Sequence, residues 1–338
     1  IATGTPARIS VASQEFETTA PTMQFDLITH VIELANDLPD PLNPQQLIAP
    51  PPPTPPFDPN YDGLVRLRRR DQYVQATRIS YAHDETRPIG TMHAQGPGRI
   101  DGFLSSGQTE IEEPIPFSAA WNGSLSLGVI NNEHVLSVDQ GMEVAYGAMG
   151  KLTARAMQLV FREIPPNPYL TPNEDEPPLR LIPHRGVLED NVRISSQKLS
   201  GEVNLLNMWF RHAISHEGYT NPGGGTDNTS ENSNNTLSAF SDPESPNSHF
   251  GPLEVTADTL QVAFFMTPDD AELGQLSIEG NVRLVETEPW RPGEPLIDCT
   301  GDKVYALRLN ADDAQLIVRG RPASFAGRGL GLSSQNIE

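Results

Sequence analysis

The chain has 338 residues, a formal net charge of −21 and a single cysteine, Cys299. The acidity argues against nucleic-acid binding, which needs a dense face of lysine and arginine. One cysteine excludes an internal disulfide and a cysteine-based zinc site, and no stretch approaches the roughly 20 apolar residues of a membrane-spanning helix.

The first half of the chain predicts two strand-rich blocks joined by a linker. Residues 1–37 form the first block of β-repeats, although residues 26–38 also have the apolar spacing of a helix. Residues 38–60 are dense in proline and predict an extended linker. Residues 61–164 form the next block of repeats.

The second half repeats this organisation. A proline-rich, acidic linker over residues 165–178 precedes a short block of repeats at 179–215, where the segment 204–214 is compatible with either strand or helix. Residues 216–251 have almost no apolar content, so we expect a disordered insertion. Residues 252–338 form the last block of repeats.

One recurring pattern within these blocks places a glycine between apolar residues of period two. It is clearest at Gly63, Gly123 and Gly280, and weaker at Gly96 and Gly320, while Asp190 takes the place of the glycine in a further copy. Period two indicates strands with one dry and one wet face. A glycine inside such a strand needs a reason. We expect Gly280 to kink its strand or to leave room for a facing side chain such as Phe264 or Tyr305.

A second pattern alternates with the first and contains a step of three after a small residue. Examples are the steps from Ala76 to Ile79, from Ala154 to Met157 and from Ala257 to Leu260. The slip would turn the dry face outward unless the backbone bends at that point. The pattern therefore predicts a corner, where a strand leaves one sheet and enters another.

No catalytic constellation stands out. His212 and His216 have helical metal-ligand spacing but border the predicted insertion, and the pairs Asp269-Asp270 and Asp312-Asp313 fall at predicted hairpin turns. We therefore expect no enzyme activity, no metal and no cofactor.

The two patterns together, as in "VTADTLQVAF" (255–264) followed by "LSIEGNVRLVE" (276–286), resemble the OstA-like domain of lipopolysaccharide-transport proteins. The likeness is best over 252–338 and covers 61–161 less well. It implies an all-β fold, an antiparallel twisted β-jellyroll of repeated strand pairs, open along one side as an apolar groove that conducts lipopolysaccharide-like lipid.

The resemblance also implies partners and a location. The partners would be lipopolysaccharide or a similar lipid, other OstA-like domains added end to end by strand pairing, and an outer-membrane β-barrel. The location would be the periplasm, associated with the outer membrane. The sequence begins at Ile1 without a signal peptide, so we expect a piece of a longer protein.

The dry-face members of the repeat strands are the candidates for lining such a groove. They are Leu125, Leu127, Met157, Leu159, Phe161, Leu260, Val262, Phe264, Ile278, Val282 and Leu284. The alternative is that these residues fill an ordinary core, in which case the chain is a structural or adhesive β-repeat module of a cell-envelope or surface protein.

Overall fold

The structure, a computed structural model, is built of β-strands, turns and short connections in the residues it describes. These are residues 2–11, 16–26, 28–35, 64–69, 72–82, 90–104, 115–146, 150–164, 180–196, 199–212, 251–266, 271–289, 292–307, 315–327 and 330–337. The prediction of an all-β, jellyroll-like fold is confirmed for this part of the chain.

The strands join into one continuous hydrogen-bonded sheet. In chain order they are β1 (Ala2–Val11), β2 (Phe16–Asp26), β3 (Val31–Ala35), β4 (Val65–Arg69), β5 (Gln72–Ala76), β6 (Arg78–Ala82), β7 (Thr91–Gln95), β8 (Gly98–Leu104), β9 (Ile115–Trp121), β10 (Ser124–Ile130), β11 (Glu133–Val138), β12 (Met142–Tyr146), β13 (Gly150–Ala154), β14 (Ala156–Ile164), β15 (Arg180–Ser195), β16 (Leu199–His212), β17 (Leu253–Met266), β18 (Ala271–Glu286), β19 (Asp298–Leu307), β20 (Gln315–Gly327) and β21 (Leu330–Ile337).

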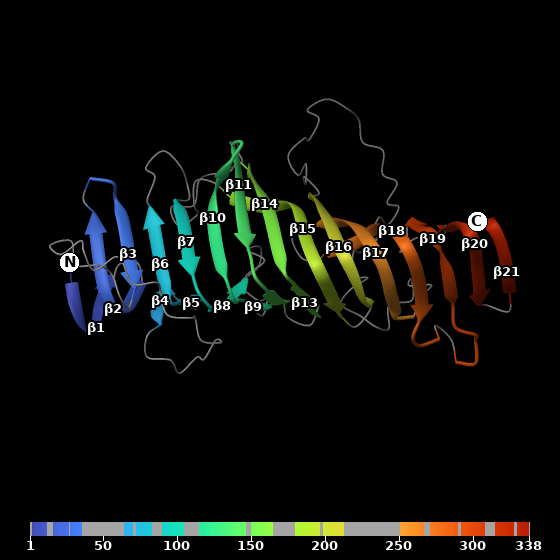
Figure 1. Cartoon of the computed structure of the whole chain (residues 1–338), viewed down its shortest axis with the longest axis horizontal. Helices are drawn as coiled ribbons and strands as arrows, with labels where there is room; N and C mark the ends of the chain where they lie inside the picture. Colours follow the sequence, from blue (N-terminus) through green and yellow to red (C-terminus); the bar gives the residue numbers. More distant parts are fainter. Residues whose placement is uncertain are drawn as a thin grey trace, which may run out of the picture.

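The sheet is folded into two rows of strands that face each other. By consecutive pairing the first row contains β3, β6, β7, β10, β11 and β14, and the second contains β4, β5, β8, β9, β12 and β13. Longer strands belong to both rows: β2 pairs with β4 through residues 16–19 and with β3 through residues 22–26. The strands lie side by side along the long axis, with the two termini at opposite ends (Figure 1).

Some strands continue directly into a strand of the other row. These connections lie on one edge of the molecule, which we call the corner edge. Such connections are β7 to β8, β9 to β10, β11 to β12 and β13 to β14. Turns within a row, such as Asn131-Asn132 between β10 and β11, lie on the opposite, open edge. Both residues of that turn have positive φ (52° and 66°), as a two-residue hairpin with a type I′ turn requires.

The predicted corners are present, and Gly280 forms one of them. The pairing register shifts between Thr256 and Thr259 in β17 and between Glu279 and Val282 in β18. Gly280 has φ +79°, so it kinks its strand as predicted. The side chain that fills the space beside it is that of Asp258, because a Cβ on Gly280 would collide with its carboxylate. The expectation that Phe264 or Tyr305 fills this space is wrong.

The same arrangement recurs at other corners. Gly96 has φ +78°, and a Cβ there would collide with Thr77, the residue after Ala76. Asp190, which replaces the glycine, also has positive φ (60°), and its carboxylate accepts a hydrogen bond from Nε of Arg155 at 2.5 Å. The contact has the same form in each case. The residue directly after the small residue (Asp258, Thr77 or Arg155) contacts the glycine position of another strand at the corner (Gly280, Gly96 or Asp190, respectively).

The remaining repeat glycines lie at corners or outside the described residues. A Cβ on Gly123 would lie 2.6 Å from Cβ of Gln140, and one on Gly320 would lie 2.7 Å from the backbone nitrogen of Asp302, so both positions need glycine for close approach. Gly63 lies outside the described residues.

The inner faces of the two rows pack into one hydrophobic core along the corner edge. In the first row the inner residues closest to the corners form a continuous cross-strand ladder that is buried at every position except the half-buried Met157. The ladder is Met23, Leu34, Ile79, Ala94, Leu125, Val138, Met157, Leu188, Leu206, Leu260, Ile278, Val304 and Val318.

Two features differ from the sequence-based expectations. The helical alternatives are wrong, because β2 ends at Asp26 and β3 begins at Val31, and residues 204–212 belong to β16. Cross-strand hydrogen bonding satisfies their backbones instead. The strand order is also not purely antiparallel: among the described pairings only β16 and β17 run parallel.

Several predicted segments lie outside the described residues. They are the linkers 38–60 and 165–178 and the insertion 216–251, of which only Gly251 is described. His216 and the aspartate pairs 269–270 and 312–313 also lie outside the described residues.

Candidate functional site

A second inner ladder lies two residues farther along each strand from the corner edge than the first. Over much of the molecule its apolar side chains are only half-buried. In the first row these residues are Ile32, Tyr81, Met92, Leu127, Leu136 and Leu159. In the second row they are Leu67, Val74, Ile100, Ala119, Val144, Leu152 and Ile194. We call these two sets together the open strip.

The same ladder continues toward the C-terminus and is buried in β16–β19, while its last members, Leu316 and Phe325 of β20, are half-buried. Its members in β16–β19 are 0–9 % exposed: Met208, Val262, Leu276 and Ala306 in the first row, and Val255, Leu284 and Cys299 in the second. We call these residues the sealed segment. The solvent exposure of the second ladder therefore changes at β16, from half-buried in the open strip to buried in the sealed segment.

The side chains of the sealed segment are buried because the strands there are longer and because a buried carboxylate holds nearby backbone over them. Beyond Met208 and Val262 the rings of Phe210 and Phe264 stack at 5.7 Å between centroids, with 16° between their planes. In the second row the fully buried Glu286 accepts hydrogen bonds from the backbone N–H groups of Gly251 (2.7 Å) and Ile297 (3.2 Å). These contacts tie residues 251 and 297 over the end of β18.

Charged side chains lie mainly on the outer faces. Cross-strand ion pairs such as Lys151–Glu143 (2.7 Å) and Arg193–Glu202 (2.9 Å) alternate with the inner residues of their strands. Among the side chains that the structure describes, no lysine or arginine occupies the open strip. The strip can therefore contact hydrocarbon, but it offers no cation to a phosphate group.

One polar pair lies on the inner face beyond the open strip. Nε2 of the buried His134 is 2.6 Å from Oε1 of Glu163, and His134 pairs across the strands with Phe161. The carboxylate provides the buried imidazole with a hydrogen-bond partner, as a buried polar group requires.

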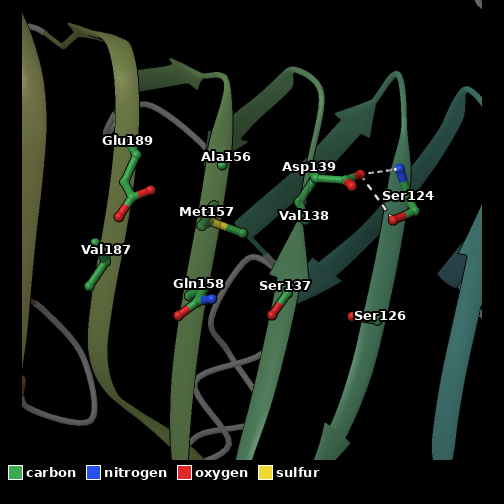
Figure 2. A pocket seen from close by; sticks show the side chains of 10 residues that line it. All are labelled: Ser124, Ser126, Ser137, Val138, Asp139, Ala156, Met157, Gln158, Val187 and Glu189. Carbon is green, nitrogen blue, oxygen red and sulfur yellow. Dashed lines mark hydrogen bonds between the residues drawn. The ribbon is translucent and has the colours of Figure 1, made fainter.

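Two hollows lie on the outer face of the first row. One, of about 220 Å³, is lined mainly by polar side chains of β10, β11, β14 and β15, which point away from the second row (Figure 2). Its Asp139 accepts hydrogen bonds from the backbone N–H (2.6 Å) and the hydroxyl (2.9 Å) of Ser124, which link the β11–β12 corner to the β9–β10 corner. The other, of about 300 Å³, lies over β6, β7, β10 and β11.

The structure divides the predicted groove residues into two groups. Leu125, Leu260, Val262, Ile278, Val282 and Leu284 are buried in the core. Leu127, Met157, Leu159, Phe161 and Phe264 are half-buried. Only Leu127 and Leu159 belong to the open strip.

Sequence reasoning missed most of the open strip and the buried Glu286. The signal for Val74, Tyr81 and Leu152 was present, because each lies two residues outside a step of three, that from Ala76 to Ile79 or that from Ala154 to Met157. Glu286 continues the inward period-two series of Val282 and Leu284, so an acidic residue at that position was the available sign of a buried carboxylate.

Comparison with protein-family models, curated proteins and solved structures finds no match. Within the described residues, no group of three or more histidine, cysteine, aspartate or glutamate side chains could hold a metal ion. The same part of the chain contains no helix long and apolar enough to cross a membrane.

Cys299 reports on the sealed segment. Burial, with a smaller contribution from the charge of Asp298, raises the pKa of its thiol from 9.0 to about 12. We expect no reaction with a thiol reagent at pH 8 in the folded protein and full reaction in denaturant.

Because the thiol of Cys299 ionises at lower pH in the unfolded chain than in the folded protein, the free energy of unfolding should fall between pH 9 and 12, by at most about 1.4 kcal/mol per pH unit. Cys299→Ala should lack this part of the pH dependence, and identical profiles for the two proteins would contradict the prediction.

Proposed function

We propose that this chain binds the acyl chains of a lipopolysaccharide-like lipid on the open strip and has no catalytic role. The observation that carries the proposal is the continuous ladder of half-buried apolar side chains on the inner faces of both rows. An ordinary core would bury these side chains, as the same ladder is buried in the sealed segment.

The dimensions and energetics of the open strip suit a hydrocarbon chain. In the first row the strip crosses from β3 to β14, five strand spacings of about 4.8 Å, or roughly 24 Å in all. Burial of one CH₂ contributes about 0.8 kcal/mol, so a chain of about a dozen carbons could gain on the order of 10 kcal/mol before ordering costs. The polar head would stay outside, where charged side chains lie.

The ends of the molecule suit the proposed partners. Among the described pairings, β1 pairs only with β2 and β21 only with β20, so each is an edge strand. Leu330 and Leu332 of β21 are 60 % and 47 % exposed. Edge strands of this kind accept another strand. We propose that other OstA-like domains or an outer-membrane β-barrel pair there, in the periplasm.

Leu136→Asn tests the proposal directly. The polar side chain would interrupt the open strip, and the loss of one buried leucine contact, about 1.5–3 kcal/mol, corresponds to weakening by about 10-fold or more. The measurement is the affinity for rough-type lipopolysaccharide, supported by mass spectrometry of lipid extracted from the purified protein.

Ser137→Asn is the matched control, because Ser137 is the neighbouring residue on the outer face of β11. Its affinity should equal that of the unsubstituted chain, and melting curves should establish that both variants are folded. An absence of bound lipid, or equal affinities for both variants, would refute the proposal.

A structural module with a filled core is the second candidate, and the sealed segment favours it. If it is right, the lipid should leave the melting temperature of the whole chain unchanged.

A further inference from the structure

We infer that the lipid site ends at β15, so that lipid reaches the open strip from the open edge and does not pass through the C-terminal third of the molecule. The inference rests on the proposed function, which it limits to one part of the interior. It assigns to β16–β19 the role of a closed segment.

The first support is a comparison of equivalent positions. Val144 and Val255 both belong to the second ladder of the second row, yet Val144 is half-buried while Val255 is 0 % exposed. Residue size does not explain the difference, because the two side chains are identical.

The second support is the way in which the sealed segment is covered. The stacked rings of Phe210 and Phe264 extend the packing beyond the ladder in the first row. In the second row Glu286 is fully buried and is hydrogen-bonded to the backbones of Gly251 and Ile297. An acyl chain that entered here would have to separate both sets of contacts.

The third support is where the change occurs. The transition lies one strand before the parallel pair β16–β17, where the chain ends one strand of the first row at the open edge and starts again at the open edge of the second. The antiparallel series is interrupted at that pair, so every residue of the sealed segment except Met208 is built by the second run of chain.

Photo-crosslinking maps the site on the unsubstituted protein. The probe is dodecanoate carrying a diazirine near the end of its chain, and the crosslinked peptides are identified by mass spectrometry. We expect crosslinks in peptides from residues 31–195 and none in peptides from residues 253–307. Crosslinks in both regions would overturn the inference and leave the proposed function standing. Crosslinks in neither region would overturn the proposed function itself.

Matched cysteine variants give an independent readout. In a Cys299→Ala background, Val144→Cys and Ala119→Cys place a thiol in the open strip, and Val262→Cys and Ala306→Cys place it in the sealed segment. We expect N-ethylmaleimide to label the first pair at least about 10-fold faster, and rough-type lipopolysaccharide to slow the labelling of that pair alone. Equal labelling rates without lipid, or slowing by lipid at Val262→Cys, would overturn the inference. If a variant melts early, the labelling of native Cys299 in the unsubstituted chain, slow and unaffected by lipid, takes its place.

Discussion

Gly280→Val is expected to lower the free energy of unfolding by about 3 kcal/mol, as measured by denaturant titration. Two costs add. A residue with a Cβ loses roughly 1–2 kcal/mol in the left-handed conformation, here at φ +79°. The new side chain also collides with the carboxylate of Asp258 across the corner. The double variant with Asp258→Ala should recover only part of the second cost, because Cβ of residue 258 remains 2.8 Å from the new Cβ, and none of the first.

Gly128→Val is the matched control for this substitution. Gly128 also lies within a strand but has no positive φ, and a Cβ there would meet only Cγ2 of Thr91 at 3.8 Å. The change should be within about 0.5 kcal/mol. The neighbour Asn281 is unsuitable as a control, because its φ is +49° and its side chain donates a hydrogen bond to Asp258. Equal costs at positions 280 and 128 would remove the corner explanation for the repeat glycines.

Glu286→Ala is expected to cost about 3 kcal/mol, because the backbone N–H groups of Gly251 and Ile297 lose a buried acceptor. The effect should also be local. Since Glu286 holds the chain over the sealed segment, its loss should speed the labelling of the Cys299 thiol well before global unfolding begins.

Glu286→Gln separates charge from hydrogen bonding at this position. The amide retains one oxygen acceptor in a similar shape, so the loss of stability should be smaller than in Glu286→Ala, and Cys299 should remain slow to react. An alanine variant with unchanged stability would show that residues 251 and 297 are held by other contacts.

The corners could be predicted from the sequence because they depend on local backbone geometry. The step of three after Ala257 and the glycine at position 280 each report a bend within a few residues of themselves. A period-two pattern likewise fixed which face of each strand is dry, and the burial of Leu125, Leu260 and Ile278 follows from it.

The extent of the candidate site could not be predicted in the same way. Leu284 and Leu152 have the same apolar alternation, yet one is buried and the other half-buried. The difference depends on what lies beyond them, namely Glu286 with its backbone partners and the stacked Phe210 and Phe264. Such contacts join segments far apart in the chain, and alternation along one strand carries no information about them.

The parallel pair β16–β17 has a consequence for how the molecule folds. Antiparallel hairpins such as β10–β11 and β15–β16 can form by zipping from a short turn, with little loop-closure entropy. Alignment of β17 with β16 must instead wait until the ends of residues 213–252 are brought together. We therefore expect the two runs of chain on either side of this pair to acquire their strands separately, before β17 aligns with β16.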